Sequence, residues 1–280
     1  MAGVSSGATA RPCPALRPFV KSYDGYRMSG FDAGTHVGMP SPDITVVIPL
    51  DDPLELAWPG ETSSRFGSLA SGLGTTPITI FHTGAQHGIQ LALTPLGART
   101  LLGVPASEIS DVVVSLDDLL GGVVTEIDHR IASVSSWRER FDVLDEVLIR
   151  RLDADTPRPD DRVAGAWHLL VGGSDARVQS VADAVGWSRR HLNTKFLSEY
   201  GVTPKDAARV ARFDRSHQLL KREHPLSLAT IAAQCGYYDQ AHMAREWREL
   251  AGSAPSVWRA NEQFAFVQDS ADLATEYWSA

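Results

Sequence analysis

The sequence has few cysteines, no long apolar run and no apolar segment after its first methionine, and each absence excludes a class of protein. The two cysteines, Cys13 and Cys235, are too few and too distant for a disulfide framework, so we expect reduced thiols. No run of eighteen apolar residues is present, which excludes a transmembrane helix. The Ser-, Gly- and Ala-rich start is unlike a secretory signal and predicts a frayed terminus. We therefore expect a cytoplasmic protein without membrane contact.

The net charge of −8 conceals an uneven distribution along the chain. Residues 175–262 contain 13 Lys and Arg against 10 Asp and Glu, whereas the rest contains 13 against 24. This small basic excess does not by itself show phosphate binding, which needs clustered cations. It does indicate that the C-terminal third differs from the acidic remainder. A length of 280 residues, with 43% hydrophobic and 21% charged, predicts two globular domains.

The first 93 residues have the pattern of short strands. Apolar, β-branched runs such as DITVVIPL (43–50) and TTPITIFHTG (75–84) contain or border prolines and glycines. Short strands with frequent turns predict a small sandwich or barrel. The pattern then changes to a short helix, with Thr94 as its cap, Pro95 in its first turn and Gly103 at its end.

The clearest helix of this half runs from Ser136 to Leu152. Ser136 and Glu139 have capping-box spacing, and apolar residues recur with the helical period. Its single apolar stripe fits either packing against the sheets or a dimer seam, and the sequence does not separate these. The polar stretch DADTPRPDD that follows predicts a linker. We therefore place a β-rich regulatory domain at 1–152, a linker at 153–160, a helical domain at 161–262 and an unassigned tail at 263–280.

The helical domain contains one pattern twice. VADAVGWSRRHLNTKFLSEYGVTP (181–204) and IAAQCGYYDQAHMAREWRELAGSAP (231–255) share an alanine, a glycine followed by an aromatic, a capping residue and a longer helix that closes at Gly and Pro. The alanine allows close helix approach, and the glycine can adopt the left-handed conformation that reverses the chain. Each copy is therefore predicted to be a helix-turn-helix. Seven helices are expected in all, the longest from Pro204 to about Glu223.

Each longer helix has an apolar side and a polar side. Leu192 and Phe196 in the first copy, like Met243 and Trp247 in the second, lie four residues apart and are expected to hold the helix down. The other side is rich in residue types that hydrogen-bond phosphates or base edges. Its members are Arg189, Arg190, Asn193, Thr194 and Lys195 in the first copy and Gln240, Ala241, His242, Arg245 and Arg248 in the second. Two such helices about 34 Å apart would fit successive major grooves of duplex DNA. The alternative is a helical repeat that binds protein.

With these residues in place, the segment from about Asp161 to Glu262 resembles the DNA-binding domain of AraC/XylS-type bacterial transcription regulators. The most specific part is IAAQCGYYDQAHMAREWRELAGSAPSVWR. Three positions, Tyr237, Trp247 and Ala254, hold residues that the family uses less often, and these are changes of packing. The resemblance implies a seven-helix domain whose two helix-turn-helix units are joined by a long helix. It implies groove-facing positions for Arg190, Asn193, Thr194, Gln240, Ala241, His242 and Arg245.

The resemblance also implies a role for the first domain. Such domains are commonly cupin-like β-barrels that sense a small molecule, dimerise or do both. We therefore expect an α+β protein that is a sequence-specific, effector-responsive transcriptional regulator, with no enzymatic activity, cofactor or metal. Its expected partner is double-stranded DNA. A small-molecule effector, RNA polymerase and a second copy of the chain are further partners, and the choice between activator and repressor stays open.

The alternative is a metal-dependent cupin-type enzyme fused to a DNA-binding domain. His36, His82 and His87 are the candidate ligands, because imidazole commonly binds zinc or iron. A catalytic barrel needs at least three convergent ligands, whereas HTGAQH provides only a pair. Isolated polar or core histidines are therefore favoured over a metal site, and elemental analysis would separate the two.

Overall fold

The computed structural model describes residues 3–153, 158–173, 177–222 and 226–261. Its strands fall within residues 4–115, and a succession of helices occupies residues 161–261. The prediction of an α+β chain, with a β-rich domain before a helical one, is therefore confirmed. The predicted tail at 263–280 and part of the predicted linker lie outside the described residues.

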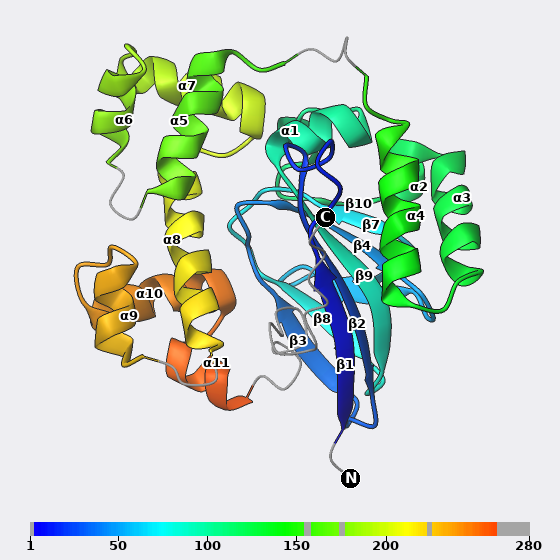
Figure 1. Ribbon diagram of the computed structural model, residues 1–280. Helices are drawn as coiled ribbons and strands as arrows, with labels where there is room; N and C mark the ends of the chain where they lie inside the picture. Colours follow the sequence, from blue (N-terminus) through cyan, green and yellow to red (C-terminus); the bar gives the residue numbers. More distant parts are fainter. Residues whose placement is uncertain (1–2, 154–157, 174–176, 223–225, 262–280) are drawn as a thin grey trace.

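Two antiparallel sheets form the first domain (Figure 1). The strands are β1 (Val4–Ala10), β2 (Val20–Ser29), β3 (Gly34–Gly38), β4 (Ile44–Pro49), β5 (Leu54–Ala57), β6 (Ser64–Phe66), β7 (Leu69–Ser71), β8 (Ile78–His82), β9 (Gln86–Leu93) and β10 (Val113–Ser115). The larger sheet has the order β1-β2-β9-β4-β7-β10, and the smaller has β3-β8-β5-β6. Met28 and Val47 of the larger sheet pack with Leu56 and Ile78 of the smaller in one apolar cluster.

The first strand corrects the prediction of a frayed terminus. β1 pairs with β2 in a register that runs from Val4 opposite Ser29 to Ala10 opposite Tyr23. A Cβ atom on Gly7 would lie 2.2 Å from the carbonyl oxygen of Gly25, so only glycine fits there without a shift of the backbone. The sequence of β1 has no clear hydrophobic pattern, and the strand is held in place by its pairing with the distant β2.

Short helices and one helical hairpin complete the first domain. They are α1 (Pro95–Gly97), the π-helix η1 (Ala98–Leu102), the 3-10 helix η2 (Ala106–Ile109), α2 (Leu116–Leu120), α3 (Gly122–Ala132) and α4 (Trp137–Ile149). Thr94 caps α1, Gly103 ends η1 with a φ of 81°, and Ser136 and Glu139 form the predicted capping box. Phe141 of α4 stacks on Tyr23 of β2 at 5.6 Å, so α4 packs against the larger sheet. The apolar face of α4 is therefore buried in the core of the first domain.

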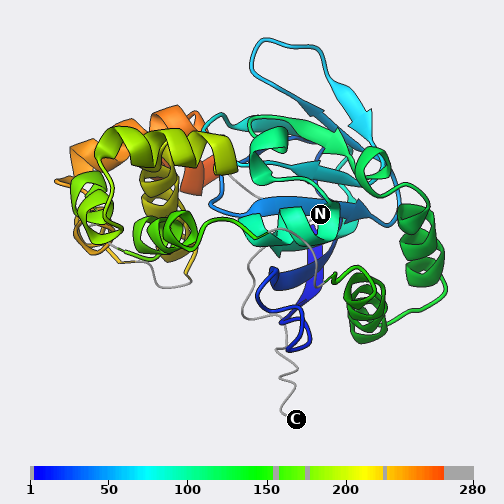
Figure 2. The same cartoon turned by 90° about the horizontal axis from the view of Figure 1, so that it is seen from above.

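The second domain consists of α5 (Asp161–Gly172), α6 (Val178–Ala184), α7 (Arg189–Tyr200), α8 (Pro204–Leu220), α9 (Leu228–Gln234), α10 (Gln240–Ala251) and α11 (Pro255–Asn261). α8 ends at Leu220, earlier than predicted, and its 17 residues span about 26 Å. α5 to α7 gather at one end of α8 and α9 to α11 at the other (Figure 1). Seen from above, this domain and the α3–α4 hairpin lie on opposite sides of the sheets (Figure 2). None of the described helices combines the length and apolar character needed to cross a bilayer.

The two ends of α8 belong to different cores. Phe196 and Tyr200 of α7 share one continuous apolar cluster with Leu101 and Ile109 of the first domain. Phe213 and Trp247, by contrast, belong to a separate cluster made mainly from α8 to α11. The first helix-turn-helix unit is therefore built onto the β-rich domain, whereas the second has its own core.

Polar and close-packed contacts tie the first unit to the β-rich domain. Arg99 donates to Glu199 at the end of α7 over 2.8 Å, and both side chains are largely buried. Gly201, which ends α7 with a φ of 73°, lies against Ser110, whose Cβ would be 2.3 Å from an added methyl group. Gly252 ends α10 with a φ of 71° but has no atom within 4 Å of the same point.

These two glycines provide a matched test of the interface between the domains. Gly252→Ala should reduce the free energy of unfolding by about 1–2 kcal/mol, because alanine is strained in the left-handed conformation. Gly201→Ala should cost about 1–3 kcal/mol more, because its methyl group also overpacks against Ser110. Urea unfolding followed by tryptophan fluorescence measures both losses. Equal losses of unfolding free energy would show that Ser110 can move away from the added methyl group without destabilising the protein.

Candidate nucleic-acid interface

The two helix-turn-helix units have the same local geometry. Gly186 and Gly236 adopt φ values of 73° and 78° in the turns, as their positions predicted. Ser188 Oγ accepts from the backbone N–H of the third residue of α7 at 3.2 Å, and Asp239 Oδ1 does the same for α10 at 2.6 Å. The second helix of each unit, α7 or α10, is called the recognition helix. Each recognition helix therefore begins at a turn that a glycine and a capping side chain stabilise.

The apolar faces of the recognition helices lie where the pattern predicted. Leu192, Phe196, Met243 and Trp247 are all 0% exposed. The indole N–H of Trp247 donates to Ser216 Oγ of α8 at 2.8 Å. Burial of these side chains leaves the opposite face of each helix in solvent.

The first recognition helix presents a cationic face. Arg189, Arg190, Thr194 and Lys195 are exposed, and Asn193 is half-buried. Thr194 donates its hydroxyl to the carbonyl of Arg190 at 3.1 Å. Arg189, Arg190 and Lys195 lie within seven residues, so these three cations can approach phosphates from one side of the unit.

A further cation, which the sequence did not point to, lies beside this unit. The guanidinium of Arg162, in the first turn of α5, lies over the ring of Trp187 at 4.9 Å. Trp187 also meets the ring of His191 edge-on at 4.8 Å. Only the fold reveals this cation, because Arg162 precedes the repeated stretch and comes from another helix.

The second recognition helix has a less cationic face. Gln240, Ala241, Arg245 and Arg248 are exposed, whereas His242 is half-buried. His242 Nδ1 accepts from the backbone N–H of Tyr238 at 3.3 Å, and its Nε2 lies 3.3 Å from Glu246 Oε1. Both ring nitrogens are thus engaged within the unit, so His242 is better placed to hold the turn than to contact a base.

The corresponding histidine of the first unit has a similar position. His191 meets Trp187 of its turn edge-on, as His242 meets Tyr237 at 5.4 Å. The next residue, Tyr238, is 93% exposed at the start of α10. Because Tyr237 and Tyr238 are adjacent aromatics, the sequence does not indicate that Tyr237 is buried and Tyr238 exposed.

A buried carboxylate fixes the second recognition helix to α8. Glu246 is only 9% exposed, and Arg212 of α8 donates to its Oε1 at 2.6 Å. Arg209 lies 3.8 Å from the same oxygen and also pairs with the exposed Glu249. Arg212 further lies over the ring of Tyr237 at 5.0 Å. This network sets the orientation of α10 relative to α8, and hence relative to the first unit.

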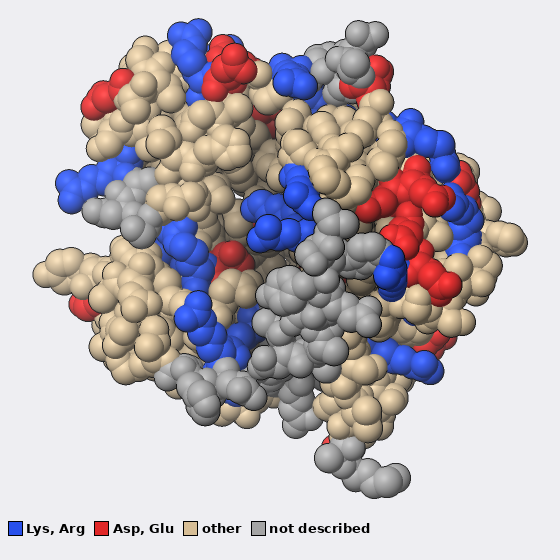
Figure 3. Space-filling view, in the orientation of Figure 1, with Lys and Arg blue, Asp and Glu red and all other residues tan. Residues whose placement is uncertain are grey.

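The charge asymmetry of the sequence is visible on the surface. Figure 3 shows basic side chains along α8 and acidic side chains gathered over α3 and α4. Several of the acidic side chains pair with arginines of the same hairpin, including Glu126 and Glu146 with Arg130. The helical domain is therefore the side of the molecule suited to a polyanion.

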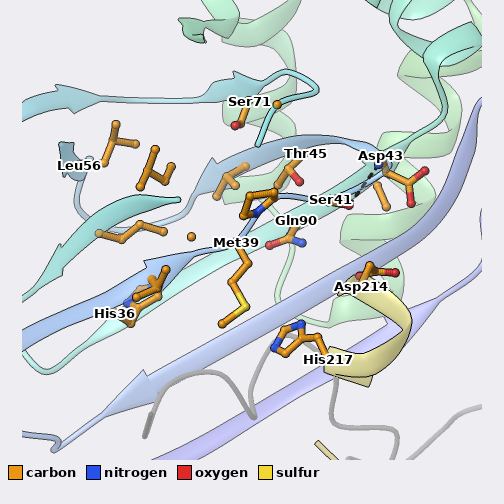
Figure 4. Close-up of a pocket in the computed structure, with 18 of the residues that line it drawn as sticks. His36, Met39, Ser41, Asp43, Thr45, Leu56, Ser71, Gln90, Asp214 and His217 are labelled. Atoms are coloured by element: carbon orange, nitrogen blue, oxygen red, sulfur yellow. Dashed lines mark hydrogen bonds between the residues drawn. The ribbon is translucent and has the colours of Figure 1, made fainter. Parts of the chain in front are cut away.

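A second site lies between the domains. A cavity of about 280 Å³ is lined by the inner side of the sheets and by the C-terminal end of α8. Figure 4 shows its strand residues, among them His36, Thr45, Leu56, Ser71 and Gln90, facing Asp214 and His217 of α8. The cavity is near the lower end of the size range of small-molecule sites.

Charged groups of both signs are among the residues that line the cavity. Lys21 Nζ lies 2.5 Å from Asp43 Oδ1, and Lys221 at the end of α8 interacts electrostatically with Asp214 and Asp24. Burial raises the pKa of each of these three carboxyl groups, and it lowers the pKa of Lys221 to about 8. These ions come from both domains, so they form part of the interface between them.

The three histidines of the metal alternative do not converge. His36 lines the cavity, where burial lowers its pKa to about 4, and its ring centre lies 5.8 Å from that of His82. His87 instead contacts Asp51 at 3.2 Å and the edge of Trp137. Within the described part of the chain, no group of three or more His, Cys, Asp or Glu side chains is arranged to hold a metal ion.

One further enzyme-like pattern is present near the amino terminus. Residues 3–7, GVSSG, match the G-x-S-x-G spacing of a hydrolase nucleophile elbow. That motif requires a sharp turn from a strand into a helix, whereas these residues lead into and form part of β1. The spacing therefore has no catalytic context here.

Comparison with known proteins identifies the helical part. A family model described as a helix-turn-helix domain matches residues 181–261. The arabinose operon regulatory protein of Escherichia coli is 26% identical over 127 residues, which cover 43% of this chain and 43% of that protein. An HTH-type transcriptional regulator of Bacillus subtilis, YbfI, is 29% identical over 112 residues, which cover 38% of this chain and 40% of that one. The alignments thus span less than half the length of these relatives.

Solved structures share the fold over most of the chain. ToxT from Vibrio cholerae O395 superimposes with a TM-score of 0.50 and 14% identity over 85% of this chain and 96% of that one. An apo variant of ToxT from Vibrio cholerae strain SCE256 gives a TM-score of 0.55 with 12% identity, over 88% of this chain and 98% of that one. The order of a β-rich domain and a helical domain is therefore shared with these proteins. The family match and the repeated units identify residues 181–261 as a helix-turn-helix domain, and the predicted resemblance of this part of the chain to AraC/XylS-type regulators is confirmed.

Proposed function

We propose that this protein is a sequence-specific DNA-binding transcriptional regulator of the cytoplasm and has no enzymatic activity. The observation that carries the proposal is the pair of exposed polar recognition helices at the two ends of α8. The names of the relatives, which are transcriptional regulators, support the same conclusion. Contact with RNA polymerase, formation of a homodimer and the choice between activation and repression stay predictions.

The proposed mode of binding places α7 and α10 in successive major grooves. Phosphate contacts would come mainly from Arg189, Arg190 and Lys195, because cations on an exposed face bind the backbone without reading sequence. Base contacts would come mainly from Gln240 and Arg245, whose side chains can form paired hydrogen bonds with base edges. The helix α8, about 26 Å long, joins the two units. The proposed mode requires α7 and α10 to lie about 34 Å apart, which is one turn of DNA.

We further propose that the cavity between the domains binds a small-molecule effector. One structure of ToxT from Vibrio cholerae strain SCE256 is bound to an unsaturated fatty acid, which supports a small-molecule role for this fold. In the present chain His217 lines the cavity and packs edge-on against Trp247 of α10 at 5.9 Å. A bound effector would therefore touch the helix that positions the second unit.

Arg245→Ala tests base recognition by the second helix. Loss of a base contact should weaken binding to a cognate duplex by about 1–3 kcal/mol and relax preference at one position of the site. The measurement is Kd for the cognate duplex and for single-base variants of it, with Arg138→Ala on the distant α4 as a control for lost charge. Equal weakening on every duplex would instead make Arg245 a phosphate contact.

Glu246→Gln and Glu249→Gln test whether α10 is held by the buried carboxylate. Both residues pair with α8, but Glu246 is largely buried whereas the Glu249 side chain is 65% exposed. Glu246→Gln should reduce the free energy of unfolding by about 1–3 kcal/mol, because it weakens charged hydrogen bonds in a partly buried place. Glu249→Gln should change it by at most about 1 kcal/mol. Similar values for the two variants would show that the network does not hold α10.

Selection from random duplexes tests the two-groove arrangement. The full chain should enrich two blocks of sequence about 10 base pairs apart, with affinity that falls steeply as salt rises. Sequencing of the bound fraction at two salt concentrations measures both effects. A single enriched block would mean that only one unit reads bases, and absence of retained duplex at low salt would contradict the proposed function.

A further inference from the structure

The cavity between the domains has an apolar body and a polar end. Its sheet side is lined by Leu54, Leu56, Trp58, Leu69, Ile78 and Ile80, with the polar residues His36, Thr45, Ser71 and Gln90 among them, and polar side chains of α8 and neighbouring loops line its other end. A ligand that fills it must therefore bury an apolar chain or ring and place one polar group near α8.

The ions near α8 disfavour a charged head group. Asp43 already pairs with Lys21 at 2.5 Å, and Lys221 lies in the field of Asp24 and Asp214. A carboxylate placed there would join three carboxylates around two ammonium groups. Since a buried ion without compensation costs several kcal/mol, a carboxylate is a poorer occupant than a neutral group. An ammonium would have to share the three carboxylates with Lys21 and Lys221, whereas a neutral group leaves these pairs undisturbed.

One neutral polar group in the wall lacks a partner. His217 Nε2 is buried, and no described residue hydrogen-bonds to it. Its ring is held by Phe213, Trp247 and Trp258, whose ring centres lie 6.2, 5.9 and 4.7 Å away. In Figure 4 the ring points from α8 toward Met39 and the cavity. An unsatisfied buried nitrogen costs about 1–3 kcal/mol, so a ligand that bonds to it gains that energy.

We infer that the cavity binds an uncharged amphiphile whose hydroxyl or comparable neutral head hydrogen-bonds to His217. This inference rests on the proposed effector role of the cavity and names the class of effector. A hydroxyl both donates and accepts, so it satisfies Nε2 in either tautomer of the neutral imidazole. Burial, with a smaller contribution from Lys221, keeps the pKa of His217 well below its usual value, so the ring is neutral at physiological pH.

The same contact provides a path from the cavity to the second recognition helix. His217 lies between the ligand position and Trp247, and Trp247 is fully buried in the core that holds α10. Trp247 also donates to Ser216, the neighbour of His217 on α8. A head group that fixes His217 would therefore fix the packing between α8 and α10, on which the spacing of the two DNA-reading helices depends.

Three probes with one chain length and different head groups test the inference: octan-1-ol, octanoate and octylamine. We expect octan-1-ol to bind the full chain with a Kd at least about tenfold lower than either ion, and to raise Tm accordingly. It should also change the affinity for the selected duplex at least about twofold. Calorimetry, thermal unfolding and duplex titration measure the three effects.

Variants of His217 separate the hydrogen bond from the packing of the ring. His217→Phe keeps an aromatic ring and should reduce the preference for octan-1-ol over the ions to less than about threefold. His217→Gln keeps a group that donates and accepts and should restore part of that preference. His168→Phe, on the exposed side of α5, is the matched control and should behave as the unmodified chain.

The outcomes distinguish the inference from the proposed function. Tighter binding of octanoate or octylamine that alters duplex affinity would overturn the uncharged class and leave the effector role standing. Binding of octan-1-ol with unchanged duplex affinity would contradict the effector role itself. Equal binding of octan-1-ol by His217→Phe, His217→Gln and the unmodified chain would remove His217 as its partner, and no binding of any probe would overturn the inference.

Discussion

The helix α8 is the constraint on which the other parts of the molecule depend. Ala207 near its start is buried in the continuous core of the first domain and the first unit, and Phe213 is buried in the core of the second unit. His217 near its end lines the cavity. A rigid helix cannot shift one of these contacts without straining the others, because packed cores have discrete rather than continuous arrangements. The core of the first unit, the core of the second unit and the cavity are thus all connected to one helix about 26 Å long.

The two units are attached to this helix in different ways. The first unit is joined to the β-rich domain by shared apolar packing and by the pair of Arg99 and Glu199. The second unit depends on α8 through Glu246, Arg212 and the packing of Trp247. A change at the cavity therefore acts on the second unit more directly than on the first. This asymmetry gives a physical reason for an effector site at the C-terminal end of α8 rather than at its start.

Sequence alone predicted the helical domain well because its signals are local. Glycines at helix ends, capping residues and apolar side chains four apart specify each unit without reference to the rest of the chain, and Gly186, Asp239 and Phe196 all lie where they were expected. The β-rich domain was predicted only in class. β1 was not predicted because its conformation depends on pairing with the distant β2. α3 was not predicted because no side chain caps its start. The cavity could not be predicted, since its walls come from residues as distant as Lys21 and Lys221.

Equivalent positions of the two repeated units hold residues of different charge and burial. The two units would therefore contribute differently to the proposed DNA interface. Lys195 of the first copy is exposed, whereas Glu246 at the same position of the second copy is buried against arginines of α8. Arg189 and Arg190 correspond to Gln240 and Ala241, so the first helix begins with two cations and the second with none. Cations gain affinity for phosphates irrespective of sequence, whereas amides and single arginines gain discrimination between bases. In this arrangement the unit anchored to the β-rich domain would supply most of the salt-dependent affinity. The unit beside the cavity would supply most of the sequence preference, so an effector that moves it would change which sites are bound more than how tightly DNA is held.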